Sequence, residues 1–335
     1  MTLPSGHPAI PTPKVGLLLV NLGTPDAAEA GAVRRYLAEF LSDPRVIEIP
    51  RLVWKPILHG IILRTRPAKS AHAYRQVWTE QGSPLAAITR AQAAALQGAF
   101  GPDVIVDHAM RYGRPALGDR LRALKEAGCE RILVAPLYPQ YCAATTATAN
   151  DAAFAALARM RWQPALRTLP PYHDDPAYIG ALKASVEASL AALDFEPQAV
   201  LASFHGMPER TLHLGDPYHC HCQKTARLLR AALGRELMIT FQSRFGRAKW
   251  LEPATDTVLA GLPAKGITRI AIVAPGFSAD CVETLEELAI RGRETFLAAG
   301  GKDFAVLPCL NASEVGVEML KTILARELAG WADAA

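Results

Sequence analysis

The stretch at residues 19–25, LVNLGTP, ends an apolar run, and a related stretch at residues 202–208, ASFHGMP, ends a second apolar run. Two further pairs of similar stretches follow in the same order, namely RYGR at 111–114 with RFGR at 244–247, and GCERILVAP at 128–136 with GITRIAIVAP at 266–275. Three ordered matches indicate two copies of one supersecondary plan. Residues that both copies share then belong to the scaffold, and residues that differ are candidates for chemistry.

Apolar runs of strand length alternate with helical patterns along the chain. The predicted strands are residues 15–21, 104–107, 132–135, 199–204, 238–241 and 270–274. Continuous apolar strands are typical of sheets buried on both faces, and strand–helix alternation predicts parallel, doubly wound α/β domains. Ligands of such sheets bind at the carboxyl ends of the strands. Residues just past these strands therefore face one cleft if the two halves pack mouth to mouth.

Length and composition exclude several classes of protein. A chain of 335 residues suits two domains of about 150 residues each. The net charge of +4 and the lack of basic runs with interleaved aromatics give no support for nucleic-acid binding. No dinucleotide or phosphate-loop motif is present. The six cysteines are scattered, no export signal pattern opens the chain, and no run of 18 apolar residues occurs, so we expect a cytoplasmic protein with reduced thiols and no membrane span.

The two copies differ by about fifty extra residues between the first and second motifs of the N-terminal half. We place the first domain at residues 14–150 with an insertion at about 45–80, the second at 151–311, and a C-terminal helix at 312–332 that joins the first. The insertion carries Trp54 among apolar and basic residues. One interpretation is a helix packed on the core. The other is an apolar lip over the cleft that also touches a membrane surface.

His205 stands where the first copy has Leu22, directly after a buried strand. A partly desolvated imidazole stays neutral near pH 7 and can accept a proton or bind a divalent metal. Its best partners are Asp280, Glu283 and Glu287, whose spacing of i, i+3 and i+7 predicts one carboxylate face on a helix. Acidic residues are common in the first turn of a helix because the helix dipole favours negative charge there. This explanation covers Asp280 and Glu283 but not Glu287, which lies further along the helix. The row suits passage of a hydrated cation or of protons.

Aromatic residues gather near predicted strand ends, among them Tyr112, Tyr138 and Trp250. Each alone is typical of a core position. Together they predict a slot for a flat apolar ligand, and Arg111 beside them could pair with a ligand carboxylate.

Several longer motifs, in order, resemble the ferrochelatase family, which inserts ferrous iron into protoporphyrin IX at the end of haem synthesis. They are VNLGTP at 20–25, PLYPQY at 136–141, SFHGMP at 203–208, GDPY at 215–218, TFQSRFG at 240–246 and PGFSADCVETLEEL at 275–288. The resemblance runs from about residue 14 to residue 311. It implies two Rossmann-like halves of the chelatase type, each a parallel sheet flanked by helices, with the porphyrin in the cleft between them.

The resemblance also implies roles for individual residues. His205 corresponds to the proton acceptor for the pyrrole nitrogens and to an iron ligand. Glu283 corresponds to the carboxylate across the pocket, which is an iron ligand or a proton conduit. Asp280 and Glu287 continue the acidic path. The implied porphyrin-pocket positions are Leu22, Ser83, Arg111, Tyr112 and Trp250, of which the serine meets a propionate; the side of iron entry stays open.

No resident cofactor is expected, because iron is a substrate of this reaction. Some members of the family carry a [2Fe–2S] cluster that uses cysteines near the C-terminus. This sequence has no cysteine after Cys309 and offers no plausible set of the four ligands that a cluster needs.

Four alternatives stay open. A chelatase for sirohydrochlorin or for coproporphyrin III would act on a substrate with more carboxylates. A non-catalytic porphyrin or haem carrier would need an axial ligand but no acidic row. A two-lobed solute-binding protein would need an export signal, which the sequence does not show.

Overall fold

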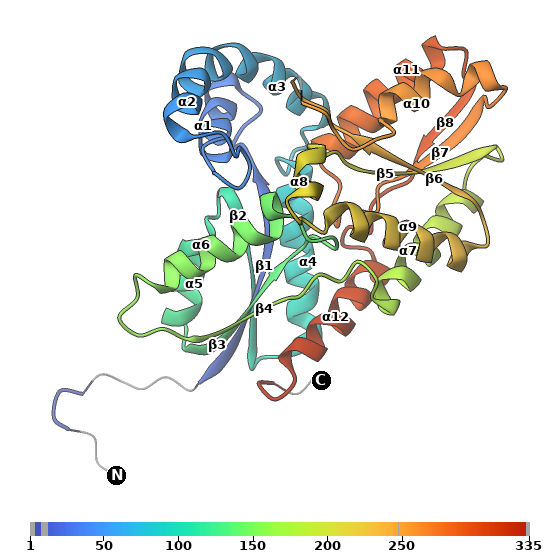
Figure 1. Cartoon of the computed structure of the whole chain (residues 1–335). Helices are drawn as coiled ribbons and strands as arrows, with labels where there is room; N and C mark the ends of the chain where they lie inside the picture. The colour runs from blue at the N-terminus through green and yellow to red at the C-terminus, as the bar shows by residue number, and fades with distance from the viewer. Residues whose placement is uncertain (1–3, 8–12, 247, 333–335) are drawn as a thin grey trace.

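The computed structural model describes residues 4–7, 13–246 and 248–332 of the chain. Its framework is two sheets of four parallel strands each, shown in Figure 1. The first sheet has the order β2-β1-β3-β4, with strands Lys14–Thr24 (β1), Val104–Gly113 (β2), Cys129–Pro136 (β3) and Ala165–Thr168 (β4). The second has the order β6-β5-β7-β8, with strands Ala199–His205 (β5), Leu237–Gln242 (β6), Arg269–Val273 (β7) and Asp303–Val306 (β8).

The equivalent strand orders confirm the duplication that the three sequence pairs predict. The strands that end in LVNLGTP and ASFHGMP, β1 and β5, occupy the same internal place in their sheets. They are covered on both faces, and Leu17 and Leu18 of β1 are fully buried, as is Phe204 of β5. The outer strands β4 and β8 were not predicted, because each has only four residues and lies at a sheet edge with half-exposed side chains.

Helices cover both sheets. Around the first sheet lie α1 (Ala30–Phe40), α2 (Arg51–Ile57), the π-helix η1 (Leu58–Ile62), α3 (Leu63–Val77), α4 (Pro84–Phe100), α5 (Leu117–Glu126), the π-helix η2 (Ala143–Ala147) and α6 (Thr148–Leu157). Along the second half lie α7 (Pro176–Ala191), α8 (Glu209–His213), α9 (Tyr218–Leu233), α10 (Thr255–Gly261), the 3₁₀ turn η3 (Pro263–Lys265), the π-helix η4 (Glu283–Gly292) and α11 (Arg293–Ala298). The last helix is α12 (Glu314–Leu328).

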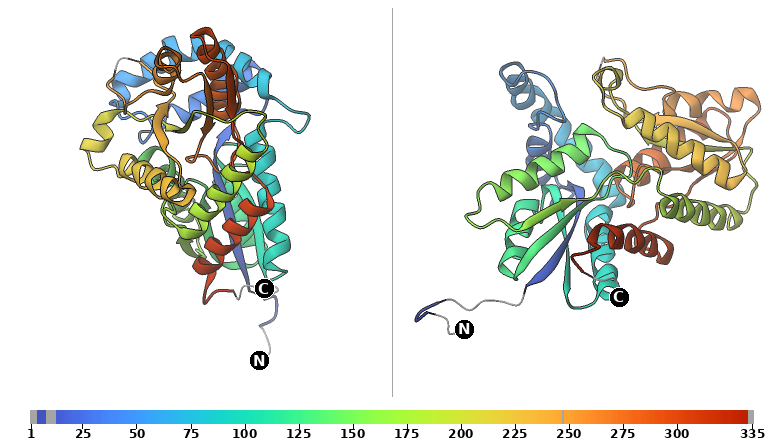
Figure 2. Two further views of the ribbon diagram at one scale, coloured as in Figure 1. Left: turned by 90° about the vertical axis from the view of Figure 1, so that its right-hand side faces the viewer. Right: turned by 60° about the horizontal axis from the view of Figure 1, so that its bottom comes forward.

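The boundary predicted at residue 150 is too early. Strand β4 pairs in parallel with β3, with Arg131 opposite Ala165, so the first sheet takes a strand from beyond that boundary. The chain passes to the second sheet only after β4. It then returns, because α12 packs on α4 and β3 as well as on α7, and both figures show it beside α4 (Figures 1 and 2).

One hydrophobic core joins the two lobes. It includes Leu19 and Leu133 of the first sheet together with Ala202 and Phe204 of the second, and side chains of α7, α9 and α12 pack between them. Burial of this shared apolar surface holds the lobes in one relative position. The shared core therefore helps to fix the relative positions of residues on the two lobes.

The insertion forms the α2–η1–α3 segment, which projects from the first lobe (Figure 1). Its inner side packs on the core: Leu58 is fully buried, and the indole N–H of Trp54 donates to the carbonyl of Leu41 at 2.6 Å. Its outer side exposes four apolar side chains, namely Ile49, Leu52, Val53 and Ile61. The packed inner face agrees with the first interpretation, and the exposed apolar side chains leave the membrane contact of the second as a prediction. Within the described part of the chain, no helix has the length and apolarity to cross a bilayer.

Gly23 is expected to be irreplaceable because β1 and β2 approach closely at this point. Its φ is +112°, and an added Cβ would lie 1.8 Å from the carbonyl oxygen of Tyr112. We expect Gly23→Ala to lower the free energy of unfolding by about 3 kcal/mol or more, measured by urea unfolding. Gly31 in α1 has open space around its Cα, so Gly31→Ala should be neutral or stabilising by up to about 1 kcal/mol. Equal effects of the two substitutions would contradict this account.

Candidate active site

His205 is the last residue of β5 and lies opposite Gln242 of β6. Its carbonyl oxygen accepts a hydrogen bond from the hydroxyl of Tyr218 at 2.9 Å, and its ring Nδ1 lies 2.7 Å from the carbonyl oxygen of Gly206. A carbonyl oxygen only accepts, so Nδ1 carries the proton in this contact. The other ring nitrogen, Nε2, is left as the basic atom that can take a proton or bind a metal.

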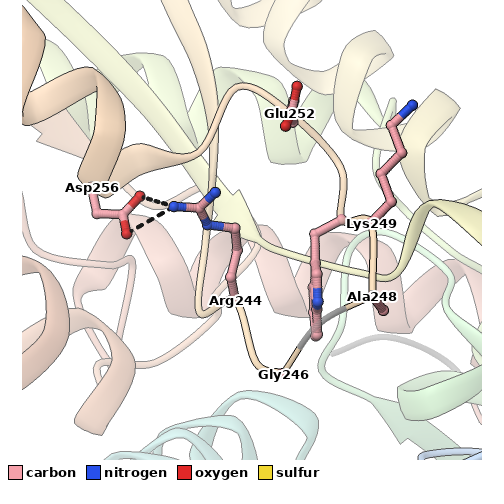
Figure 3. Close-up of a pocket in the computed structure, with 7 residues that line it drawn as sticks. Arg244, Gly246, Ala248, Lys249, Glu252 and Asp256 are labelled. Atoms are coloured by element: carbon pink, nitrogen blue, oxygen red, sulfur yellow. Dashed lines mark hydrogen bonds and ion pairs between the residues drawn. The ribbon is translucent and has the colours of Figure 1, made fainter.

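The turn after His205 is tightly packed. A Cβ on Gly206 would lie 2.5 Å from the carbonyl oxygen of Gln242 and 3.3 Å from the ring of Trp250. The indole of Trp250 therefore lies beside the histidine turn, and its N–H donates to the carbonyl of Phe245 at 2.9 Å. The loop between β6 and Trp250 borders a hollow of about 350 Å³ (Figure 3).

Glu283 and Glu287 lie on η4, which forms a π-helix where an α-helix was predicted. Its wider turn brings residues four apart to one side, and π-helical segments are frequent at functional sites. The end of β6 holds both residues: Gln242 donates from Nε2 to the carbonyl of Glu283 at 3.0 Å, and Ser243 donates from its backbone N–H to the carboxylate of Glu287 at 2.8 Å and from its hydroxyl at 2.5 Å.

The electrostatics place Glu287 near both His205 and Glu283. Burial raises the pKa of Glu287 most, and the carboxylate of Glu283 raises it further. The hydrogen bonds from Ser243 and the positive potential of His205 oppose this rise. Glu287 therefore interacts electrostatically with both His205 and Glu283.

The first lobe meets this group through tyrosines. Burial raises the pKa of Tyr36 on α1 and of Tyr74 on α3, and the carboxylate of Glu283 raises both further. Helix α3 also contacts η4 directly. Glu283, which lies on the second lobe with His205, is therefore on the side of η4 that faces the first lobe.

Asp280 does not continue the carboxylate row, which corrects the predicted stripe of three. It precedes η4 and is buried. Its carboxylate accepts hydrogen bonds from the hydroxyl of Thr284 at 2.8 Å and from the side-chain amide of Asn311 at 2.6 Å. The row that faces His205 consists of Glu283 and Glu287.

The predicted porphyrin positions Arg111 and Tyr112 lie within β2, which runs to Gly113 and not only to residue 107 as predicted. Arg111 is ion-paired with Asp43 and donates to Thr148. Tyr112 is 1% exposed, and its hydroxyl donates to Asp43 at 2.9 Å. Tyr112 thus supports Asp43 and Arg111 from a buried position, and its place in the porphyrin pocket stays a prediction.

The other pocket positions lie at the carboxyl end of the first sheet. Leu22 is half-buried in β1. Ser83 is buried directly before α4, accepts a hydrogen bond from the hydroxyl of Thr24 at 2.9 Å, and borders a hollow of about 210 Å³. The hydroxyl of Tyr138, which follows β3, is buried without a hydrogen-bond partner among the described residues. It offers a polar contact that a bound molecule can satisfy.

Comparison with known proteins agrees with this geometry. A family model described as ferrochelatase matches residues 14–328. A ferrochelatase of Rhizobium meliloti is 57% identical over 97% of this chain and 98% of the relative, and one of Agrobacterium fabrum is 56% identical over 98% of both.

This chain belongs to the ferrochelatase family. It is an enzyme, a metal chelatase of haem biosynthesis that inserts iron into a porphyrin. The solved structure of SirB from Bacillus subtilis with Fe³⁺ has a TM-score of 0.57 and 14% identity over 96% of this chain and all of that one. A SirB complex with cobalt gives a TM-score of 0.55. These similarities show a shared chelatase-like fold.

Sequence reasoning about this ferrochelatase missed several residues that shape the site. Gln242 and Ser243 lie inside the motif at 240–246, but nothing in the sequence showed that they hold η4. Tyr74 belongs to the insertion, and its approach to Glu283 depends on how α3 crosses to the other lobe. Asp43 lies in a loop with no motif of its own.

Among the described residues, no three or more His, Cys, Asp or Glu side chains are grouped so that they could hold a metal ion. The six cysteines are free, and all but Cys220 are buried. The absence of an iron–sulfur cluster stays a prediction from the sequence.

Replacing Glu287 should change how stability depends on pH. Its pKa is raised in the folded chain, so the protonated form is favoured there, and this contribution to stability is lost as the pH rises through the raised pKa. Glu287→Gln stays uncharged. Urea unfolding between about pH 4 and about pH 8 should show the variant gaining stability relative to the parent as the pH rises. A difference that stays constant with pH would contradict the raised pKa, and Glu236→Gln, whose side chain is 88% exposed, is the matched control.

Proposed function

We propose that His205 and Glu283 carry out the insertion of Fe²⁺ into protoporphyrin IX, with release of two protons to form protohaem. The observation that carries this proposal is that the free Nε2 of His205, at the end of β5, lies on the same lobe as the two carboxylates of η4, of which Glu287 interacts electrostatically with the histidine. Free-base porphyrin must lose two N–H protons, and the entering ion must give up water. Both steps need a base and metal ligands held in fixed positions in a cleft.

In this proposal His205 accepts a pyrrole proton at Nε2 from one side of the macrocycle. Glu283 binds the entering iron or takes the second proton. Glu287, whose carboxylate is held by two hydrogen bonds from Ser243 and whose pKa is raised by burial, passes protons onward by exchanging between its charged and neutral forms. Tyr138, Leu22 and Trp250 would contact the ring.

Protoporphyrin is favoured over substrates with more carboxylates. Arginines near the cleft are already paired within the protein: Arg111 with Asp43, and Arg244 with Asp256 at 2.8 Å (Figure 3). Sirohydrochlorin and coproporphyrin III carry more acidic groups and would need more free cations. A carrier without catalysis is disfavoured because it has no use for the two carboxylates opposite His205.

An anaerobic assay tests the reaction. Purified protein, protoporphyrin IX and Fe²⁺, or Zn²⁺ as a surrogate, should give multiple turnovers, followed by the change from a free-base to a metalloporphyrin spectrum. Coproporphyrin III and sirohydrochlorin run in parallel should turn over more slowly. Binding of tetrapyrroles without turnover would favour a carrier instead.

His205→Ala should lower the insertion rate by roughly 100-fold or more, the range lost with a general base. Binding of free-base protoporphyrin, measured by fluorescence quenching, should survive. His213→Ala is the matched control, because this histidine is 72% exposed on α8. Loss of porphyrin binding together with activity would show that His205 is structural.

We also propose that the reaction needs no resident cofactor, iron being consumed as a substrate. Insertion by protein that elemental analysis shows to be free of bound metal would test it.

We further propose that the protein works in the cytoplasm and touches a membrane surface through its lip. The support is the exposed apolar set on the α2–η1–α3 segment, in which Leu52 is 91% exposed and Val53 is 56% exposed. Arg51 and Lys55 on the same helix can interact with anionic head groups.

Sedimentation with anionic vesicles tests the lip. The double substitution Leu52→Ser with Val53→Ser should reduce the bound fraction several-fold, because about 1 kcal/mol or more of apolar burial is lost per side chain. Val315→Ser on α12, 40% exposed in the parent, should leave binding unchanged. Equal vesicle binding by all three proteins would remove the lip from the interaction.

A further inference from the structure

The segment just before η4 is held by a reciprocal pair of hydrogen bonds. The backbone N–H of Asp280 donates to the side-chain oxygen of Asn311 at 2.8 Å, and the side-chain amide of Asn311 donates back to the carboxylate of Asp280 at 2.6 Å. Asn311 has a φ of +52°, a conformation in which Asn and Asp are enriched. The loop after β8 is thereby fixed to the start of the helix that carries Glu283.

The second carboxylate oxygen of Asp280 reaches into the helix itself. It accepts a hydrogen bond from the hydroxyl of Thr284 at 2.8 Å, and that hydroxyl accepts one from the backbone N–H of Cys281 at 3.1 Å. Asp280 and Thr284 are both buried. The Asp280 carboxylate thus connects Asn311, in the loop after β8, to Thr284, the residue that follows Glu283.

The other lobe completes this network. Gln92 of α4 donates from its single amide nitrogen to the carbonyl of Ser278 at 3.1 Å and to the carbonyl of Asn311 at 2.9 Å. Gln92 is 1% exposed, and its own amide oxygen has no partner among the described residues. We call these contacts between Gln92 and the loops of Ser278 and Asn311 the junction. A buried amide that is bonded to both loops resists displacement of the lobes, because breaking these hydrogen bonds leaves buried polar groups unpaired.

We propose that Asp280 is a positioning residue that, with Asn311 and Gln92, sets the place of Glu283 relative to the first lobe, and that it does not carry protons. Both of its oxygens are engaged by neutral donors that hold backbone in place. This inference rests on the role proposed for Glu283 in metal insertion. A displacement of about 1 Å at a catalytic group can cost roughly 100-fold in rate, so a rigid connection between the lobes matters to the chemistry.

Exchanging the two side chains separates positioning from proton transfer. Asp280→Asn alone places amide against amide, and Asn311→Asp alone places carboxylate against carboxylate. Each should lower kcat for metal insertion by roughly 100-fold with little change in KM for porphyrin. The double variant Asp280→Asn with Asn311→Asp restores an amide–carboxylate pair, in which the side-chain bond runs from position 280 to position 311 and the charge lies at position 311. It should recover at least about tenfold of the loss, as coupled residues do in a double-mutant cycle.

The opposite result would overturn the proposal. If the double variant melts like the parent but stays as slow as Asp280→Asn, a carboxylate at position 280 is itself required, as a proton path demands. Asp175→Asn is the matched control, because Asp175 caps α7 away from the site; it should leave kcat unchanged.

Two further variants keep the test decisive if the exchanged protein folds poorly. Thr284→Val and Gln92→Leu leave Asp280 intact but cut its connections to η4 and to α4. Each should slow insertion and speed hydrogen exchange of the peptide at residues 279–288. Parent-like turnover in both would refute positioning. A different outcome separates the two proposals. If the parent inserts no metal but both variants exchange faster than the parent, the junction is upheld and the proposed role of Glu283 is refuted.

Discussion

The site depends on keeping two neighbouring carboxylates in a partly buried place opposite a histidine. Glu283 and Glu287 repel each other, and burial penalises their charges. Ser243 offsets this with two hydrogen bonds to Glu287. To deliver both donors, the backbone of Ser243 adopts a φ of +65°, an uncommon conformation for a residue with a side chain. The backbone conformation at the end of β6 thus allows Ser243 to stabilise the carboxylate of Glu287 on η4.

The shared core explains why such a site can lie between two lobes. Side chains of both sheets pack in one apolar cluster, and α12 returns to α4 after the second sheet is complete. Hydrogen bonds between the lobes add to this apolar packing. Gln140 donates to Thr225 at 3.0 Å, and the backbone N–H of Ala143 donates to Asp216 at 2.8 Å. These contacts tie the segment after Tyr138 to α9. A cleft framed in this way can hold a rigid flat ring while the base and the carboxylates stay in place.

Much of the fold was predictable because it rests on local patterns. Two ordered copies of three motifs indicated two equivalent sheets, and the two strand orders are equivalent. The errors have physical causes. The edge strands β4 and β8 are too short to show a pattern, and the boundary at residue 150 failed because β4 pairs across it. Asp280 left the predicted row because η4 begins only at Glu283 and is a π-helix.

The sequence alone determined the inner strands, the duplication, and the candidate side chains His205, Glu283 and Glu287, because these follow from periodicity, turn chemistry and motifs along the chain. Only the tertiary structure decided what each side chain contacts. It placed Tyr112 in the core beside Asp43, directed Asp280 to Asn311, and put Ser243 under Glu287. Such contacts join residues far apart in sequence, and they depend on how strands align and lobes pack, which no local pattern encodes.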